Sequence, residues 1–324
     1  MLATPIRTAV VGVGYFGESH AKHYALNPLA KLVAVVDIDE ARAQAVAQKF
    51  GVEHATNYRS LVGRIDAASV TVPTPLHFEI ARDLIDWGID VLVEKPITDS
   101  LLSATALATL AEQRQRILQV GHIERFSAAY RVLSEMITRP LYIESYRISP
   151  WKARGSEVDV ILDVMIHDID IIMGLDPSPV IKVDAVGAPI LSKRSDLANA
   201  RIVFETGCVA SVTASRVSYK TERRLRVFQP NNYLVCDFAN GRIFGYSLRG
   251  DPASEGAGAI STQSVEIPKE DSLANEIAAF LTCVASRAKP SVDGRAGCEA
   301  LRVASLINDS IREHYERVEA RFSR

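Results

Sequence analysis

Short apolar runs alternate with amphipathic segments through the first third of the chain. The apolar runs are rich in valine and alanine and are expected to be buried strands; they cover residues 6–11, 31–36, 67–72, 90–93 and 117–120. The segments between them have the apolar spacing of helices and end at glycine, proline or a polar break; they cover residues 16–26, 39–50, 77–87 and 100–115. Strands that alternate with helices predict a parallel sheet with right-handed crossovers.

The pattern changes after Gly121. The next predicted elements are a helix, a strand and a longer helix, at residues 127–137, 141–148 and about 160–174. Strand-like runs then follow one another with turn signals but no helical pattern between them, which indicates an antiparallel sheet; they cover residues 182–186, 200–204, 208–215, 223–228, 233–237 and 242–246. The Gly/Ala/Ser-rich stretch 251–264 is expected to be a loop. Residues 272–324 are expected to be helical apart from a break at 290–294.

Composition indicates a globular chain without a nucleic-acid or membrane partner. The 324 residues are 48% hydrophobic and 23% charged, and their formal net charge of −2 excludes a strongly basic nucleic-acid footprint. No apolar run reaches membrane-spanning length, and the first strand follows Met1 too closely for a signal peptide, so we expect a cytoplasmic protein. The four cysteines form no Cys-x-x-Cys pair, which favours reduced thiols over a disulfide framework or a zinc site.

Gly12, Gly14 and Gly17 follow the first apolar run and spell Gly-x-Gly-x-x-Gly, and Asp37 ends the second run. A dinucleotide site needs this arrangement. The first glycine permits the tight turn, the second lets the backbone approach the pyrophosphate, and the third lets the helix pack closely on the strand. Asp37 would accept the ribose hydroxyls. We therefore predict a nicotinamide or flavin dinucleotide, with NAD favoured over NADP because Asp37 would repel a 2′-phosphate, unless Arg42 offsets it.

Ligands of parallel sheets bind at the carboxyl ends of the strands. Three predicted loops leave such ends, at residues 12–17, 73–77 and 94–96, and should converge on one crevice. The fold class expected is α/β. Residues 1–122 would form a Rossmann dinucleotide-binding domain, and residues 123–324 an α+β domain with an open-faced, mostly antiparallel sheet for substrate binding and oligomerisation.

Two further motifs complete a family resemblance. Glu94-Lys95-Pro96 follows a predicted strand, and Asp163-Val164-Met165-Ile166-His167 lies in the predicted long helix. Together with the glycine motif and the trailing antiparallel sheet, they resemble the Gfo/Idh/MocA family of dehydrogenases over essentially the whole chain. The resemblance implies an NAD-dependent enzyme acting on CH–OH groups, usually on a sugar, sugar nucleotide or cyclitol. It also implies that Lys95 and His167 are catalytic and that Asp163 contacts or orients the substrate; which of Lys95 and His167 takes the proton stays open.

The residue types fit that chemistry. Asp163 and His167 are four apart, so a helix would present them on one face, where the carboxylate would stabilise the protonated imidazole. The Lys95 ammonium would polarise the substrate oxygen and stabilise a developing alkoxide. Because the carbinol carbon must lie close to the nicotinamide while the base touches its hydroxyl, we expect one cleft, with Lys95 and His167 on opposite walls. A metal stripe through Asp159, Asp163, His167 and Asp170 is the alternative; without a cysteine or a second close histidine, we expect no metal.

The resemblance also implies a set of cofactor contacts, and three of these residues have a structural alternative. The expected cofactor-binding residues are Gly12, Gly14, Tyr15, Phe16, Gly17, Asp37, Pro73, Thr74, His77, Glu94, Lys95 and His122. His77 could instead only begin a helix, and His122 could instead be a packed domain-interface histidine. Lys95 could be a solvated charge in a turn whose proline merely ends the strand.

The loop at residues 149–156 carries the substrate clues. Trp151 offers an aromatic plane, Lys152 and Arg154 offer two cations, and Arg147 precedes the loop; these groups suit stacking and phosphate neutralisation. We expect Trp151 and Arg154 to contact substrate; the alternative is a solvated connector with a half-buried tryptophan. The helix at 159–170 is similar to the branch of the family acting on UDP-N-acetylglucosamine-type substrates, whose 3-keto product goes to an aminotransferase. An inositol or simple sugar is the alternative substrate.

Two non-enzymatic classes compete with a dehydrogenase. A dinucleotide-binding sensor needs no base, so the expected catalytic set argues against it. A structural oligomer with a vestigial Rossmann fold needs neither intact glycines nor Asp37. Homo-oligomerisation itself is expected, as a dimer or tetramer, because the runs Cys208–Ala214 and Tyr233–Cys236 have semi-apolar alternate faces. With helices on one side of the second sheet only, its other face would lie open to water unless a partner covers it.

Overall fold

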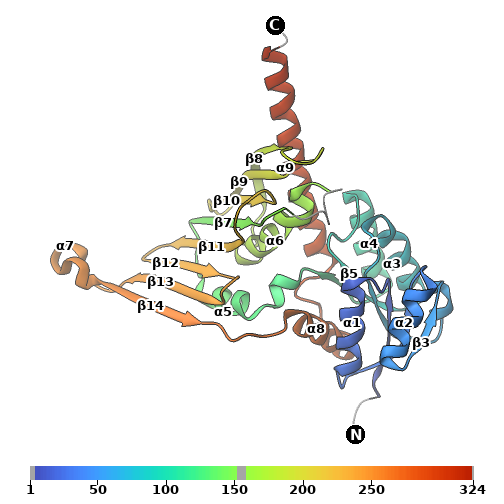
Figure 1. Ribbon diagram of the computed structural model, residues 1–324. Coiled ribbons are helices and arrows are strands. Elements are labelled where there is room, and N and C mark those ends of the chain that lie inside the picture. The colour runs from blue at the N-terminus through green and yellow to red at the C-terminus, as the bar shows by residue number, and fades with distance from the viewer. Residues whose placement is uncertain (1–3, 152–157, 323–324) are drawn as a thin grey trace. The chain divides into compact units, whose positions relative to one another are not determined.

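A computed structural model describes residues 4–151 and 158–322 (Figure 1). The chain divides into two compact units. The first comprises Met1–Phe126 and Asp271–Leu301, and the second comprises Ser127–Glu270 and Arg302–Arg324. The first unit therefore receives a late segment that the sequence-based boundary at residue 122 assigns to the second domain.

The first unit is built on a six-stranded parallel sheet in the order β3-β2-β1-β4-β5-β6. Its strands are β1 (Ile6–Val11), β2 (Ala30–Val36), β3 (Glu53–Ala55), β4 (Ala67–Val70), β5 (Asp90–Glu94) and β6 (Leu118–Gly121). Its helices are α1 (Tyr15–Leu26), α2 (Glu40–Phe50), α3 (His77–Asp86), α4 (Leu101–Gln113) and α8 (Ser272–Ser286). The strand order reverses beside β1, so the loops that follow β1 and β4 leave the sheet at its topological switch point.

Helix α8 joins the first unit because its apolar face completes that unit's core. Ile277 and Phe280 are fully buried in a cluster with Ala21 and Tyr24 of α1. The helix begins at the N-cap Asp271, whose side chain accepts the first free backbone N–H groups. An amphipathic pattern predicts the helix but does not state which core its face will meet, and this is why the sequence-based boundary differs here.

The second unit is built on an eight-stranded sheet in the order β14-β13-β12-β11-β7-β10-β9-β8. Its strands are β7 (Tyr142–Ile148), β8 (Val180–Ala188), β9 (Leu197–Phe204), β10 (Val209–Ser215), β11 (Glu222–Gln229), β12 (Asn232–Asp237), β13 (Arg242–Leu248) and β14 (Ile260–Glu266). Among these described strands, β7 and β10 pair in parallel and the other neighbours pair antiparallel. The α/β class with a second, mostly antiparallel sheet is thereby confirmed.

The expected loop at 251–264 is wrong. A short helix, α7 (Pro252–Glu255), lies at the tip of the β13–β14 hairpin, and β14 then pairs with β13 (Figure 1). Strand β14 is largely exposed and reads Ile-Ser-Thr-Gln-Ser-Val-Glu, so it lacks the apolar alternation that marks a half-buried strand.

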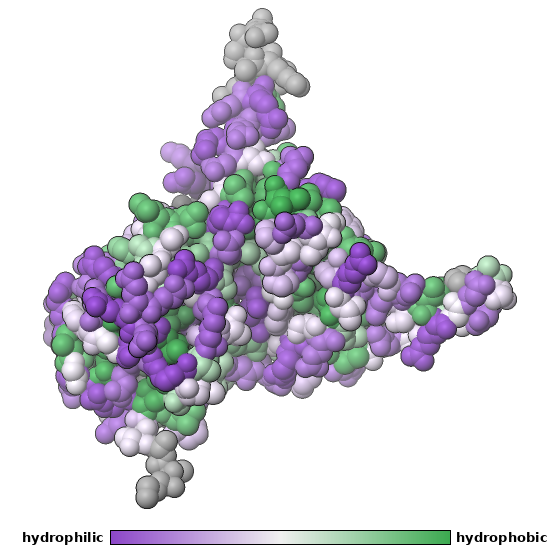
Figure 2. Space-filling model, turned by 180° about the vertical axis from the view of Figure 1, so that it is seen from behind, coloured by the Kyte–Doolittle hydropathy of each residue, from purple (hydrophilic) through white to green (hydrophobic). Residues whose placement is uncertain are grey.

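The remaining helices of the second unit are α5 (Ala128–Met136), α6 (Ile166–Leu175) and most of α9 (Gly294–Phe322). Helix α9 lies along β8: Ser310 Oγ accepts the Ala185 N–H at 2.8 Å, and the Tyr315 hydroxyl donates to Gly187 O at 2.5 Å. Beyond that edge the helix surface is mostly hydrophilic (Figure 2). No helix among the described residues is both long and apolar enough to span a membrane.

Candidate active site

The glycine turn has the geometry of a dinucleotide cradle. Gly12 has a φ of +88°, and a Cβ there would lie 2.8 Å from the backbone nitrogen of Val72. A Cβ on Gly17 would overlap the carbonyl oxygen of Gly12, whereas Gly14 faces open space. Gly14 is also the N-cap of α1, so no side chain covers the first amides of the helix. These features fit a bound pyrophosphate, since the backbone can approach it and the helix N-terminus favours its charge.

Asp37 lies directly after β2 and is almost buried beside this turn. Its carboxylate accepts the backbone N–H of Val13 at 2.9 Å and of Asp39 at 3.0 Å. The guanidinium of Arg42 donates to both carboxylate oxygens, at 3.2 and 3.3 Å. The acid is thus held in place by its own chain, and a cation is part of its surroundings.

Hydrogen bonds tie together the loops that follow β1, β4 and β5. The Thr71 hydroxyl donates to Gly12 O at 2.5 Å. The ring nitrogens of His77 lie 2.9 Å from Pro96 O and 2.8 Å from Val72 O. The three loops therefore lie together, as expected from their places at strand ends. His77 is buried and braces two of them, and its burial lowers the pKa of the imidazole.

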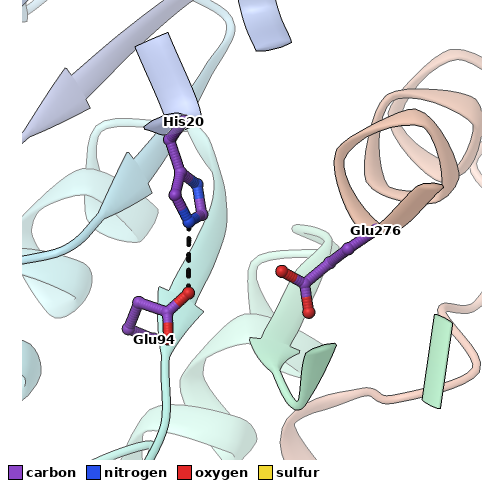
Figure 3. A group of neighbouring side chains, drawn as sticks. All are labelled: His20, Glu94 and Glu276. Atoms are coloured by element: carbon purple, nitrogen blue, oxygen red, sulfur yellow. Dashed lines mark hydrogen bonds and ion pairs between the residues drawn. The ribbon is translucent and has the colours of Figure 1, made fainter. Parts of the chain in front are cut away.

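Lys95 follows β5 and is half-buried, in a turn whose acid, Glu94, contacts a histidine of α1. Its backbone N–H lies 3.3 Å from Glu94 Oε2, and Glu94 Oε1 lies 3.1 Å from His20 Nε2 of α1 (Figure 3). The other His20 nitrogen lies 3.0 Å from Ser69 Oγ, which lies 2.8 Å from the Tyr24 hydroxyl. A buried chain of polar groups thus runs from Tyr24 to the Glu94-Lys95-Pro96 turn.

Glu276 of α8 points toward the same group (Figure 3). The ligand atoms of His20, Glu94 and Glu276 all lie within 4.8 Å of one another, a grouping of the kind that can hold a metal ion. Both His20 nitrogens already have protein partners, so a metal would have to displace one of them. Burial raises the pKa of Tyr24, and the Glu276 charge adds to that shift. Sequence patterns missed this cluster, although Glu276 interrupts an otherwise apolar helix face.

Asp163 and His167 lie on a helix that begins irregularly. Residues Ile161–Met165 form a π-helical turn, closed by the Ile166 N–H donating to Ile161 O, and α6 continues from Ile166. The expected helix at 160–174 is present, but its first turn is wider than an α-helix, a feature often found at functional sites. Asp163 and His167 stay partly exposed while Met165 and Ile166 are buried. Both side chains therefore remain accessible, as their proposed roles require.

Arg147 does not offer its charge to solvent. It lies in β7, is buried, and pairs with Asp168 of α6, with Nη2 2.8 Å from Oδ1. Because Asp168 takes its charge, the suggestion that Arg147 neutralises a phosphate is not supported. Trp151 is 37% exposed, with the Arg216 guanidinium 5.6 Å from its ring centre. Lys152 and Arg154 lie outside the described residues.

Comparisons with known proteins show which protein family has these features. Residues 6–122 match a family model described as an oxidoreductase family with an NAD-binding Rossmann fold. The UDP-N-acetylglucosamine 3-dehydrogenase of Acidithiobacillus ferrooxidans is 34% identical over 313 residues, which cover 96% of this chain and 99% of that protein. The chain belongs to the Gfo/Idh/MocA family.

A solved structure and a further relative agree with this placement in the Gfo/Idh/MocA family. The solved structure of UDP-N-acetylglucosamine 3-dehydrogenase GnnA from Acidithiobacillus ferrooxidans superposes with a TM-score of 0.89 at 34% identity, and the match covers 95% of this chain and 98% of that one. The scyllo-inositol 2-dehydrogenase (NAD(+)) of Bacillus subtilis is 31% identical over 232 residues, 66% of this chain and 68% of that protein. The chain is therefore an NAD-binding oxidoreductase with dehydrogenases as relatives.

Within this Gfo/Idh/MocA chain, the expected site residues fall into both units. The first unit holds the glycine turn, Asp37, Lys95 and the remaining expected cofactor contacts. Of these contacts, Tyr15 is 77% exposed at the start of α1, whereas His122 is buried just after β6. Asp163, His167 and Trp151 belong to the second unit.

Proposed function

We propose that the chain is an NAD-dependent dehydrogenase that oxidises the 3-hydroxyl of a UDP-N-acetylhexosamine, with UDP-N-acetylglucosamine as the substrate to test first. The observation that carries this proposal is the 34% identity, along nearly the whole length of both chains, to a relative named for that reaction. The partly exposed Asp163 and His167 and the shared neighbourhood of the glycine turn and Lys95 support it, because they are the groups that such an oxidation requires.

The proposed residues divide the chemistry of the reaction between them. A bound NAD would supply the acceptor for the hydride that leaves the carbinol carbon. The Lys95 ammonium stabilises negative charge on the substrate oxygen as the hydroxyl proton leaves. The proton goes either to His167 or to Lys95 if its side chain is a neutral amine before the reaction. Asp163 orients His167 and stabilises its protonated form. The product is a ketone at the same carbon, and its chemistry suits a downstream aminotransferase.

The proposed cofactor is NAD rather than NADP. Asp37 keeps a carboxylate where the ribose hydroxyls of the cofactor are expected, and a 2′-phosphate there would be repelled. Arg42 is the counter-argument, since it lies against the same carboxylate. Arg42 also pairs with Asp39 at 3.1 Å, so two carboxylates share its charge, which favours NAD.

We propose a homodimer or homotetramer in a reducing compartment such as the cytoplasm. The four cysteines, all in the described part of the chain, form no disulfide. One face of the second sheet carries partly exposed aromatic side chains on β7, β11, β12 and β13, whereas the alternate residues of these strands are buried. A second copy of the chain covering that face would remove the aromatic surface from water.

The test is NADH formation from UDP-N-acetylglucosamine, followed by absorbance, with an aminotransferase and an amino donor to remove the ketone. Free N-acetylglucosamine, UDP, scyllo-inositol and myo-inositol are run in parallel at equal concentrations. Turnover that requires both the sugar and the UDP group supports the proposal. Robust turnover of an inositol with none of the UDP-sugar would favour the second candidate, an inositol dehydrogenase, which the 31% identity to the Bacillus subtilis relative motivates.

A further inference from the structure

We propose that Arg216 is a positioning residue that holds both Trp151 and the start of the helix bearing Asp163 and His167. The proposal rests on the proposed function for the roles of that helix and of Trp151. Its structural content is independent of the substrate, because every contact it uses lies inside the second unit.

Arg216 follows β10 directly and is buried. Its Nε lies 2.8 Å from Oδ1 of Asp196, whose side chain has no exposure, and its own side chain is 5% exposed. The Arg216 backbone N–H also donates to Asp196 O at 3.0 Å. Two charges this deeply buried must be paired and hydrogen-bonded, so the guanidinium is confined to one orientation.

Asp196 is a fixed anchor for that guanidinium. Three backbone N–H groups donate to its Oδ2, at 2.8, 2.6 and 2.8 Å, from Ile190, Leu191 and Ser192. Burial alone would raise the pKa of Asp196, but the hydrogen bonds from Leu191, Ser192 and Arg216 outweigh it and hold the pKa well below its usual range. The carboxylate therefore stays ionised near neutral pH, and Arg216 keeps its partner.

The rest of the guanidinium makes three further contacts, with Val158, Ser192 and Trp151. Nη1 donates to Val158 O at 2.7 Å, and Nη2 donates to Ser192 Oγ at 3.2 Å. The guanidinium carbon lies 5.6 Å from the centre of the Trp151 ring, within reach of a cation–π interaction. One side chain thus holds the Trp151 ring and the Val158 carbonyl at the same time.

Val158 leads directly into the helix, and the neighbouring residues are held by the same turn. The Val160 N–H donates to Ser195 O at 2.9 Å, next to the anchor in sequence. Asp159 accepts the Leu162 N–H at 2.9 Å, and Asn308 donates to the other Asp159 oxygen at 3.3 Å. The start of the helix is therefore fixed by side chains and by the turn that fixes Arg216.

This support matters because the helix begins with a π turn rather than a regular α turn. The π turn contains Asp163, and its last residue, Met165, lies two positions before His167. A wide turn of this kind is less stable than an α turn, so its neighbours must hold it. Release of Val158 would let the turn relax and move Asp163, while His167 would stay attached to α6.

A second buried pair holds the helix further along and makes the first one testable. Arg147 and Arg216 lie at the carboxyl ends of the adjacent parallel strands β7 and β10, where Arg147 is in register with Ala214. Arg147 pairs with Asp168, the residue after His167. Because Arg147 holds α6 separately, a change at Arg216 should displace Asp163 and Trp151 more than His167.

The first experiment measures position without relying on activity. Trp87 and Trp151 are the two tryptophans of the sequence, so Trp87→Phe leaves Trp151 as the single indole emitter. In that background, Arg216→Gln and Arg216→Lys are each expected to increase acrylamide quenching of Trp151. Hydrogen exchange of residues 158–165 is expected to accelerate, while exchange in α6 beyond Asp168 changes little. Lysine keeps the charge but lacks the planar fork that contacts three partners together.

The second experiment measures turnover of UDP-N-acetylglucosamine by the same variants. Arg216→Lys is expected to lower kcat/KM for the sugar nucleotide about tenfold or more, with the KM for NAD within about twofold of the parent. Arg242→Gln is the matched control, because Arg242 pairs with Glu266 in an exposed position of the same unit. It should change neither quenching nor turnover.

Unchanged Trp151 quenching and unchanged exchange at 158–165 in folded Arg216→Lys would overturn the proposal, whatever the activity. If Arg216→Gln does not fold, Arg216→Lys still decides. If the parent enzyme does not turn over the UDP-sugar, the proposed function fails, but the quenching and exchange results still decide whether Arg216 positions the helix. Faster exchange confined to residues 158–165 would support the proposal in that case too.

Discussion

The Arg42 guanidinium lies 3.2 and 3.3 Å from the two carboxylate oxygens of Asp37. This pair places a cation beside the acid that is expected to reject NADP. We predict that Asp37→Ser changes the cofactor preference toward NADP, because it removes the repulsion and leaves Arg42 to pair with a 2′-phosphate. The ratio of kcat/KM for NAD to that for NADP should fall about tenfold to a hundredfold, which corresponds to about 1.4–2.8 kcal/mol.

The Asp37→Ser/Arg42→Gln double variant is the control for this prediction. Without Arg42, the increase in kcat/KM for NADP should largely disappear, although Asp37 is no longer there to repel the 2′-phosphate. An equally strong NADP gain in the double variant would show that Arg42 has no part in it. Calorimetry with both cofactors separates binding from turnover.

Lys95 should be required for the chemical step rather than for cofactor binding. We predict that Lys95→Met lowers kcat by about a hundredfold to ten-thousandfold, the range typical of general acid–base groups. The Kd for NAD should stay close to that of the parent, measured by quenching or calorimetry. His167→Asn should behave alike, and a comparable loss of NAD binding in either variant would contradict these roles.

The Lys95→Arg variant distinguishes between the two candidate proton acceptors, Lys95 and His167. Arginine keeps the positive charge but does not release a proton near neutral pH. If His167 takes the proton, Lys95→Arg should retain far more activity than Lys95→Met. If both lysine variants are equally inactive, Lys95 is the acceptor.

Sequence patterns predicted the places of the glycine turn, Asp37 and Lys95 in the fold, because each follows a strong local signal. Gly12 and Gly17 are required by steric contacts that only glycine avoids. Asp37 and Lys95 each come directly after a buried apolar strand, and such strand ends are easy to recognise in a parallel sheet. The strand–helix alternation also fixes the order of elements in the first unit, although β3 was missed because it is short and polar.

The features that were missed depend on contacts distant in sequence. From the sequence alone, both Arg147 and Trp151 are expected to face a ligand, because both lie in or beside the loop at residues 149–156. The structure instead buries Arg147 against Asp168, while Trp151 remains partly exposed. No sequence pattern in helix α8 indicates that it packs on the core of the first unit. The role of Glu276 depends on its neighbour His20, which is more than 250 positions away in the sequence. Such pairings arise from tertiary packing and cannot be deduced from local periodicity.

The buried chain from Tyr24 to Glu94 should contribute to stability through His20. We predict that His20→Ala lowers the free energy of unfolding by about 2–4 kcal/mol, because it removes one buried hydrogen-bond partner from each of Ser69 and Glu94 and opens a cavity. Tyr24→Phe is the mild control and should cost about 1 kcal/mol, since it removes one hydroxyl. Urea unfolding of each variant gives both values. A His20→Ala cost no larger than that of Tyr24→Phe would contradict the proposed support of the Lys95 turn.

His77 should make the protein less stable as the pH falls. Burial lowers the pKa of the imidazole, so in the folded state His77 is neutral below the unfolded-state pKa of about 6.5. The unfolded chain takes up a proton below that pH and the folded chain does not, so stability present above pH 6.5 is lost as the pH falls toward the folded-state value. The Tm advantage of the parent over His77→Gln should therefore shrink between pH 7 and pH 5. A constant difference would contradict a neutral buried His77.

The aromatic face of the second sheet should mediate self-association. Tyr142, Phe228, Tyr233 and Tyr246 form a continuous row across four strands, with ring-centre distances of 5.7, 4.7 and 6.1 Å between neighbours. Tyr246 is 43% exposed, so a charge can replace it without entering the core. We predict that Tyr246→Arg shifts the assembly toward a monomer, because a cation in the contact would have to be desolvated without a partner.

Light scattering coupled to size exclusion, over a range of protein concentrations, measures this shift. Tyr219→Arg is the matched control: it makes the same exchange at a residue that is 91% exposed and outside the aromatic row, and should leave the assembly unchanged. Both variants should fold, since neither side chain is buried, and thermal unfolding checks this. A monomeric parent protein would refute the association itself. An oligomer that both variants leave intact would mean that copies of the chain meet through another surface, because an unpaired arginine is not tolerated at the centre of a dry contact.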